Sequence, residues 1–446
     1  MLKPALSASV LAAVIVAIFW AYQSFFLLPK ASVSSNEPMI FDSYDDDDIA
    51  YLNEARSTSK LANFSFSKTL EQAAKNHALY LNKHNIIAHD ELPTNELFTG
   101  QSPSIRAMNA GHNNSYVTEN LSSKQLSLKD SIDALLSAIY HRFNFLNFNL
   151  DELGYFTNNG IYAYEMSNKQ ISALCQNASD FSNTLYLLNL CKQENKKVTK
   201  DAFDNATKPK KPDYIIFPNP KFASLAVFGD EDPDPLPQCD ITSPPVSIEF
   251  NENLGDVKLV NFEILKDGKK LENTLLFDAK SDPNKKLNQR QFALFSLLPF
   301  EFGAKYTAQV AYQTQNTNKI LTWDFITKTP KYEYFSVSDG DIIHIEPNKN
   351  YEIYFKPKNC HDALNEYTYI KQNNIELSIA QSAPNTLRIN ASAKNGDIIN
   401  LSTNMGAKIK LVINEKKQNT NYAVFVGLWL ILSVALFLIF KQIIKR

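Results

Sequence analysis

The chain has 446 residues, which at roughly 150 residues per domain predicts about three domains. Its 45 basic and 47 acidic side chains leave a formal net charge of -2, and no basic cluster lies away from the chain ends. A surface that binds nucleic acid through its phosphates is therefore not expected. Only 12 glycines are present, and none stands in the spacing of a dinucleotide fingerprint or a P-loop. These observations argue against nucleic acid and nucleotide partners.

Two uncharged segments, one near each end of the chain, are long enough to cross a membrane. Residues 5–28 would form about 36 Å of helix, more than the roughly 30 Å hydrocarbon core of a bilayer. Residues 423–440 are followed by a short basic tail, which the positive-inside rule places in the cytoplasm. We therefore expect a transmembrane helix or signal anchor in residues 1–30 and a transmembrane helix in residues 422–441.

Two such spans predict a cell-membrane protein whose residues 31–421 are extracytoplasmic, in the periplasm or on the cell surface. A cleaved signal peptide is an alternative for the N-terminal segment, since Lys3 gives a positive n-region and residues 31–33 form a weak cleavage site. Both interpretations export the middle of the chain, where disulfides are permitted. The disulfide candidates are Cys175, Cys191, Cys239 and Cys360, and four cysteines leave three pairings open.

Residues 45–168 have the pattern of a mainly helical region. Apolar residues at helical spacing predict amphipathic helices over residues 70–81 and 128–146. A hairpin is predicted over residues 155–164, where two apolar runs flank an Asn-Asn-Gly turn. His77 lies on the apolar stripe of the first helix, so we interpret it as a core histidine.

The pattern changes after residue 168. Residues 169–240 contain runs of proline and charge that prevent continuous structure, and we interpret them as a Pro-rich connector. In residues 241–329, and with a weaker pattern in residues 330–416, apolar and polar residues alternate in short runs separated by turn residues. This spacing of short strands is typical of an immunoglobulin-like sandwich, so we expect one or two all-β modules.

His141 is the most informative histidine in the helical region. It lies nine residues after Ile132, which is about 180° around a helix, so it faces away from the apolar stripe. It therefore faces either solvent or a cleft built by other segments, and the flanking Tyr140 and Arg142 favour the cleft. His344 and His361, in the second β module, are interpreted as structural or exposed.

Several short motifs occur in the order found in one known family. They are Leu52-Asn-Glu-Ala-Arg56, Ala73-Ala-x-x-His-Ala78, Ala88-His89-Asp90, Phe98-Thr-Gly100, Glu119-Asn120, Tyr140-His141-Arg142 and Glu152-Leu-Gly154. In these motifs the chain resembles the CAP superfamily (cysteine-rich secretory proteins, antigen 5 and pathogenesis-related proteins), in its bacterial SCP-like extracellular branch. The resemblance implies an α-β-α sandwich over residues 45–168, and hence an α+β chain when the β modules are included.

The same resemblance implies a central cleft lined by histidine and glutamate, which in some members binds a divalent metal. His89, Glu119 and His141 match the cleft positions, and the second acid is Glu91 or Glu96. Two imidazoles can supply nitrogen ligands to zinc, so His89 and His141 are the candidate metal ligands and Glu119 the candidate catalytic base. The alternative is a hydrogen-bonded polar cluster that only holds the sandwich together.

Three functions remain open from the sequence. We favour a membrane-anchored binding protein that contacts a cell-envelope component or a protein partner, because no complete nucleophile-base signature is present. The alternative is a metal-assisted hydrolase of peptides or envelope polymers, with zinc on His89 and His141. Binding of a lipid or sterol is allowed by the resemblance, but no motif in this chain supports it.

Overall fold

The computed structural model describes residues 49–125, 127–177, 185–208, 212–315 and 317–414. Both predicted membrane segments, in residues 1–30 and 422–441, lie outside these ranges, as do Lys3 and the possible cleavage site. Across the described residues, no helix combines the length and apolar character needed to span a bilayer.

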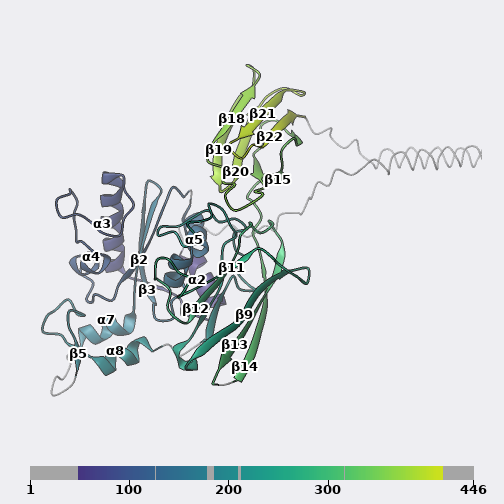
Figure 1. Cartoon of the computed structure of the whole chain (residues 1–446). Helices are drawn as coiled ribbons and strands as arrows, with labels where there is room; N and C mark the ends of the chain where they lie inside the picture. The colour runs from purple at the N-terminus through teal and green to yellow at the C-terminus, as the bar shows by residue number, and fades with distance from the viewer. Residues whose placement is uncertain (1–48, 126, 178–184, 209–211, 316, 415–446) are drawn as a thin grey trace, which may run out of the picture. The chain divides into compact units, whose positions relative to one another are not determined.

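A four-stranded sheet with helices on both faces forms the first part of the described chain (Figure 1). Its strand order is β1-β3-β4-β2, so β2 is an edge strand. The elements of this part are α2 (Ala50–Thr58), β1 (Ser65–Phe66), α3 (Lys68–His84), α4 (Pro103–Asn109), β2 (Thr118–Ser123), α5 (Leu128–Ser137), α6 (Ile139–Phe145), β3 (Glu152–Asn158) and β4 (Ile161–Ser167). The predicted helix over residues 70–81 and the predicted hairpin are both present, the hairpin with two left-handed residues at Asn159 and Gly160.

Alternation along the strands explains the three layers. Leu121 and Ala163 face α3 and pack against Ala74, Ala78 and Leu81. Tyr162, Tyr164 and Met166 pack on the opposite face with α2 and α5. Helix α3 lies so close to β3 that a Cβ at Gly154 would stand 1.9 Å from the backbone nitrogen of Glu71, so this strand position requires glycine.

The predicted helix over residues 128–146 is interrupted at Ala138, whose backbone is extended. Before the break, Ile132 and Leu136 pack in the core beneath the sheet. After it, Ile139 and Phe143 pack in a different core with apolar residues from further along the chain. The single apolar stripe expected from the sequence therefore serves two cores, and α5 and α6 are separate helices.

Short elements occupy much of residues 169–240. They are α7 (Lys169–Gln176), β5 (Tyr186–Leu187), β6 (Val198–Thr199), α8 (Lys200–Thr207) and β7 (Tyr214–Phe217). A disulfide joins Cys175 to Cys191 beside α7, and β7 pairs with the first strand of the β region that follows.

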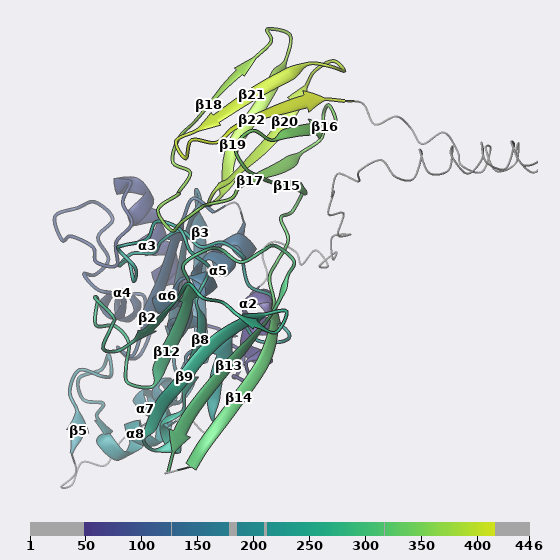
Figure 2. The same cartoon turned by 45° about the vertical axis from the view of Figure 1, so that its right-hand side comes forward.

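Two four-stranded sheets make up the next part, with strand orders β10-β9-β13-β14 and β11-β12-β8-β7. Their strands are β8 (Val246–Phe250), β9 (Val257–Lys266), β10 (Lys269–Lys270), β11 (Thr274–Asp278), β12 (Gln291–Ser296), β13 (Lys305–Thr314) and β14 (Thr317–Ile326), with a 3-10 turn η1 (Glu252–Leu254). Ile264, Val310 and Trp323 of the first sheet share one core with Ile248 and Leu294 of the second. Figure 2 shows β9, β13 and β14 side by side in the first sheet.

The last described part repeats this construction with sheets ordered β15-β17-β20-β19 and β16-β22-β21-β18. Its strands are β15 (Glu333–Val337), β16 (Ile342–Ile345), β17 (Tyr351–Phe355), β18 (Tyr367–Lys371), β19 (Glu376–Ala383), β20 (Thr386–Ser392), β21 (Ile398–Thr403) and β22 (Lys408–Ile413). Ile353 and Ile389 of one sheet pack with Leu401 and Leu411 of the other. A second disulfide joins Cys239 to Cys360. The α+β composition expected from the sequence is thus confirmed.

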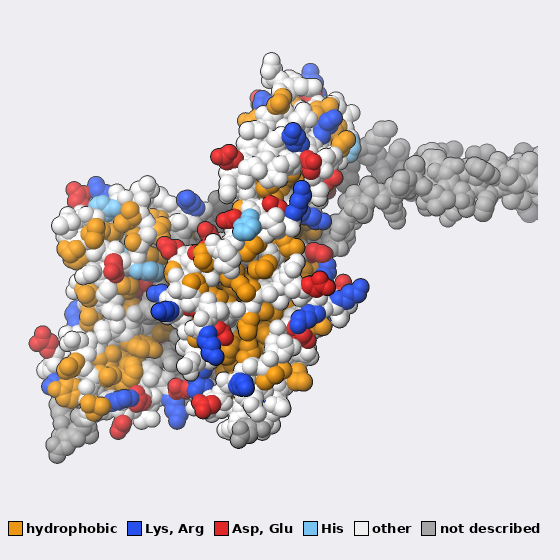
Figure 3. Space-filling view, viewed as in Figure 1, with side chains coloured by type: hydrophobic (Ala, Val, Ile, Leu, Met, Phe, Trp, Pro, Cys, Tyr) orange, Lys and Arg blue, Asp and Glu red, His pale blue; other side chains and the backbone are white. Residues whose placement is uncertain are grey.

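Apolar side chains also reach the surface over α3 and α4, where orange atoms gather in Figure 3. The exposed members come from the connecting loop and the start of α4, and are Ile86, Ile87, Leu92, Leu97, Phe98 and Ile105. His89 lies in this same loop. Its surroundings at the surface are therefore partly apolar.

Candidate functional site

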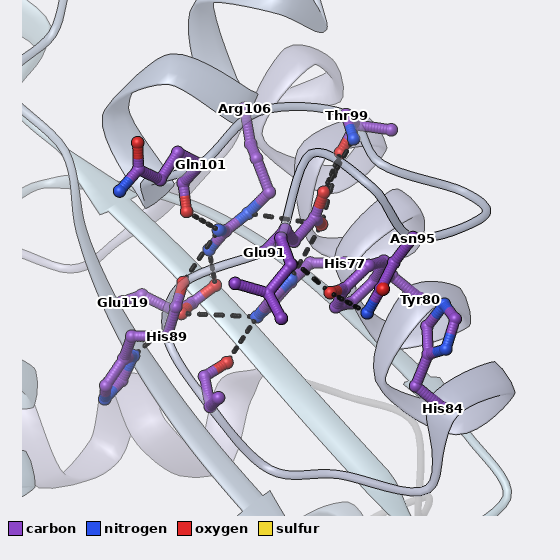
Figure 4. A network of polar contacts seen from close by, with 12 residues as sticks. His77, Tyr80, His84, His89, Glu91, Asn95, Thr99, Gln101, Arg106 and Glu119 are labelled. Carbon is purple, nitrogen blue, oxygen red and sulfur yellow. Dashed lines mark hydrogen bonds and ion pairs between the residues drawn. The ribbon is translucent and has the colours of Figure 1, made fainter.

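His77 lies in a buried polar network between α3 and the edge strand β2 (Figure 4). Its Nδ1 is 2.9 Å from Oε1 of Glu91, and its Nε2 is 3.0 Å from the carbonyl oxygen of Ala88. The Nε2 atom is also 3.7 Å from Oε1 of Glu119. Both ring nitrogens therefore face oxygen acceptors. The structure buries His77 as the sequence suggested, but in a polar cluster.

Arg106, on α4, brings a buried positive charge to the same network. Its Nη2 donates to Oε2 of Glu119 at 2.7 Å, and its Nη1 donates to the carbonyl oxygen of His89 at 2.7 Å. Its Nε lies 3.8 Å from Oε1 of Glu91. Arg106 thus neutralises buried carboxylates and also fixes the loop that carries His89.

Three buried carboxyl groups of the network have shifted pKa values. Burial by itself raises the pKa of Glu119, but His77, the hydrogen bond from His89 and Arg106 more than offset it and hold the pKa below its usual value. The pKa of Glu91 is likewise lowered, since hydrogen bonds from His77 and the Thr99 backbone outweigh burial. Burial and the Glu119 charge raise the pKa of Glu165 well above its usual value. The surroundings therefore favour the ionised form of Glu91 and Glu119 and the protonated form of Glu165.

His89 and His141 come together although they belong to different layers of the sandwich. His89 follows α3 and His141 is on α6, yet their ring centroids are 6.5 Å apart with planes inclined by 28°. The His89 side chain is 49% exposed, and that of His141 is 12% exposed. Nδ1 of His89 is 2.8 Å from Oε1 of Glu119 on β2. The two rings thus form a pair in which His89 is half-exposed and His141 is largely buried.

The carboxylate that contacts His141 comes from outside this part of the chain. Oε2 of Glu231 is 3.0 Å from Nδ1 of His141, across a sequence separation of 90 residues. Sequence reasoning missed Glu231 because it lies in the segment interpreted as a Pro-rich connector. The only signal there is an acidic run around it, which is equally typical of a solvated loop.

The structure separates the two acids that the sequence left open. Glu91 is buried and bonded within the network, whereas the Glu96 side chain is 74% exposed and pairs with Lys83. Glu91 therefore lies with His89, Glu119 and His141, and Glu96 does not. His344 and His361 lie elsewhere, and the His361 side chain is 68% exposed.

Metal ligation at this site would depend on the two histidines. Within the described ranges, no group of three or more His, Cys, Asp and Glu side chains is arranged to hold a metal ion. However, each of the paired rings has Nδ1 against a carboxylate, which leaves Nε2 available, as is usual for metal-binding histidines. The 6.5 Å separation of the rings is near the upper limit for sharing one ion through Zn–N bonds of about 2.1 Å. At this separation the two rings could share one ion only in a nearly linear arrangement, so they would have to move closer together to bind a tetrahedral zinc ion whose coordination water completes.

A cavity of about 290 Å³ is lined in part by Gly229 and Asp230, which directly precede Glu231 in the chain. Residues between Gly229 and Ile241 and between Ala363 and Asn385 line it. None of the candidate residues His89, Glu91, Glu119 and His141 takes part in this lining.

Comparison with known families decides what the first part of the chain is. Residues 49–163 match the family model CAP, described as the cysteine-rich secretory protein family. They form a CAP domain. The resemblance seen in the sequence motifs is thereby confirmed, and the histidine pair lies within the matched residues. Together with the two disulfides, the CAP domain indicates that this region lies outside the cytoplasm.

Two bacterial structures are similar to this CAP domain. An extracellular protein containing an SCP domain from Bacillus anthracis is 20% identical over 26% of this chain, with a TM-score of 0.24, and the match spans 37% of that protein. An outer surface protein from Borrelia burgdorferi is 24% identical over 29% of this chain and 96% of its own, also with a TM-score of 0.24. Tandem immunoglobulin domains of titin are 13% identical over 39% of this chain and 88% of theirs, with a TM-score of 0.15. No curated protein matches the chain.

Proposed function

We propose that this is a membrane-anchored extracytoplasmic protein whose CAP domain presents His89 and His141 as a binding site for a divalent metal ion, with zinc as the best candidate. Support for the anchor comes from the two uncharged segments near the chain ends, each long enough to cross a bilayer. The extracytoplasmic location of the CAP domain agrees with that arrangement.

One observation carries the metal part of this proposal. The two rings lie 6.5 Å apart, and each has Nδ1 fixed by a buried carboxylate. Such carboxylates orient a histidine and make its other nitrogen a better ligand. The family resemblance points to the same two residues. Bound zinc would supply a Lewis acid at this surface, and water would complete its coordination.

The two β sandwiches extend the proposal beyond the CAP domain. Each consists of two facing four-stranded sheets, which is the construction of an immunoglobulin-like module. We assign them the role of spacers and contact surfaces for an envelope component or a protein partner.

Hydrolysis is the alternative activity, and it would need Glu119 as a general base. The Glu119 side chain is fully buried, its pKa is lowered, and its oxygens are bonded to His89 and Arg106. A carboxylate with a lowered pKa is a weak base, and both oxygens of Glu119 already bond His89 and Arg106. These observations favour a role for Glu119 in orienting His89, and hence a binding function.

Zinc titration of the full chain in mild detergent tests the proposal. We expect His89→Ala and His141→Ala each to weaken zinc binding at least tenfold, because each removes one of two protein ligands. His361→Ala removes an exposed histidine elsewhere and is the matched control, with less than a twofold effect expected. Equal affinities for all four proteins would rule out this site.

A further inference from the structure

We propose that Glu231 completes the histidine site, so that the site is shared between the CAP domain and the segment that follows it. Glu231 would act as a positioning residue for His141. The effect of Glu231 on metal binding rests on the proposed function. Its effect on the His141 ring can be measured whether or not a metal binds.

The contacts of Glu231 define its role. Its Oε2 accepts from Nδ1 of His141 at 3.0 Å, and its Oε1 accepts from the backbone N–H of Ile139 at 2.5 Å. The Glu231 side chain is only 2% exposed, so water competes little for these hydrogen bonds. Since a carboxylate only accepts, the His141 ring donates from Nδ1, and in the neutral ring Nε2 is then the nitrogen that carries the lone pair.

Glu231 repeats for His141 what Glu119 does for His89. In both cases a buried carboxylate contacts Nδ1, at 3.0 Å for His141 and 2.8 Å for His89. Both rings are therefore oriented through Nδ1, and Nε2 is the other nitrogen in each ring. Such an arrangement suits a pair that binds one ion, and the CAP domain alone supplies only one of the two carboxylates.

The residues beside His141 are held in the same way by later parts of the chain. The Tyr140 hydroxyl donates to Asp282 and accepts from Nδ2 of Asn284. Nη1 of Arg142 donates to the carbonyl oxygen of Pro245 at 2.6 Å. Three consecutive residues of α6 are therefore each bonded to a segment beyond residue 229.

Apolar packing supports the same conclusion. Ile139 and Phe143, also on α6, share a core with Phe228 and Leu236. The position of α6, and with it that of His141, is thus set by the connector and the first β sandwich. This explains why the helix separates from α5 at Ala138.

Glu231→Gln tests the role of the carboxylate with little change in shape. The amide oxygen can still accept from the Ile139 N–H, so the fold is retained, but the ring of His141 loses its charged partner. Asp232→Asn is the matched control, because it removes the same charge from the exposed neighbouring residue. Thermal melts of all proteins establish that they are folded.

Two readouts on the full chain decide the question. Zinc titration should give at least a tenfold weaker affinity for Glu231→Gln and less than a twofold change for Asp232→Asn. Nitrogen-15 NMR of the histidine rings, with His141 assigned from His141→Asn, should show the Nδ1–H tautomer in the wild type and its loss in Glu231→Gln.

Each outcome is informative. Unchanged zinc affinity together with an unchanged His141 spectrum in Glu231→Gln would overturn the inference. If the wild type binds no zinc, the proposed metal function fails, and the tautomer of His141 alone then decides whether Glu231 positions this ring. A loss of the Nδ1–H tautomer supports the inference in that case too, and its persistence overturns it.

Discussion

Glu119 and Glu165 stand directly opposite each other on the antiparallel strands β2 and β4, and both are buried. Two buried carboxylates so placed cannot both carry a charge without a large cost. The surrounding groups resolve this by lowering the pKa of Glu119 and raising that of Glu165. The negative charge therefore stays on Glu119, which contacts His89 and orients its ring.

Replacing Glu165 by glutamine tests whether Glu119 carries the charge and Glu165 the proton. The folded state holds the Glu165 proton more tightly than the unfolded chain, which releases it near pH 4.5, so the wild type loses stability as the pH rises above that value. Glutamine stays neutral and does not incur this loss. Urea unfolding should show a stability gain for Glu165→Gln that grows from pH 5 to pH 8. A variant that is less stable than the wild type at pH 8 would contradict the assignment.

Glu249 on β8 provides a second pH-dependent group. Burial raises its pKa to about 8, against hydrogen bonds from Gln291 and Asn288 that lower it, and its Oε2 has no hydrogen-bond partner. The folded state therefore loses stability as the pH rises from about 4.5 to about 8. Between pH 5 and pH 8 the advantage of Glu249→Gln over the wild type should grow by about 3 kcal/mol. A stability difference between Glu249→Gln and the wild type that stays constant over this pH range would refute the prediction.

Arg106 should matter far more to stability than a surface cation. Arg106→Met leaves the buried carboxylates of Glu91 and Glu119 without their guanidinium partner and should cost about 3–5 kcal/mol in the free energy of unfolding. Lys83→Met breaks the exposed pair with Glu96 and should cost below about 1 kcal/mol. Denaturant unfolding of both variants compares the two sites. Similar costs for the two substitutions would show that the network is not held by Arg106.

A largely buried ion pair connects the CAP domain to the end of the first β sandwich. Nζ of Lys328 lies 2.5 Å from Oδ1 of Asp133, also contacts the Tyr51 hydroxyl, and burial lowers the pKa of Lys328. Lys328→Met should destabilise the protein by about 3 kcal/mol, because it leaves the Asp133 carboxylate buried without its cation.

The same change in an Asp133→Leu background should cost much less, since no buried charge is then left unpaired. A double-mutant cycle in urea measures the coupling. Additive effects of the two substitutions would mean that the pair contributes no coupling energy.

Much of the fold could be predicted because its signals are local. The alternation of Val246, Ile248 and Phe250 with polar residues marks β8 within the bounds that the structure gives. The turn at Asn159 and Gly160 likewise fixes the register of β3 with β4, since both residues adopt left-handed backbone. By contrast, β7 is a short apolar run among prolines and lysines, and only its pairing with β8 makes it a strand.

Only those residues of the candidate site that lie in the family motifs could be predicted from the sequence. His89, Glu119 and His141 follow from the family resemblance, but no helical period governs the loop that holds Glu91 and Glu96, so sequence could not choose between them. The break at Ala138 occurs in a residue that favours helix, because contacts with Glu231 and with the core around Phe228 override that preference. Glu231 itself lies 90 residues from the ring that it contacts.

Zinc content of the full chain tests the central claim most directly. The wild type and the double variant His89→Ala with His141→Ala are incubated with excess zinc, desalted and analysed for bound metal. Close to one zinc ion per chain in the wild type, and none in the double variant, is the predicted result. Equal zinc content in the two proteins, or no zinc in the wild type, would contradict the claim that the histidine pair is a metal site.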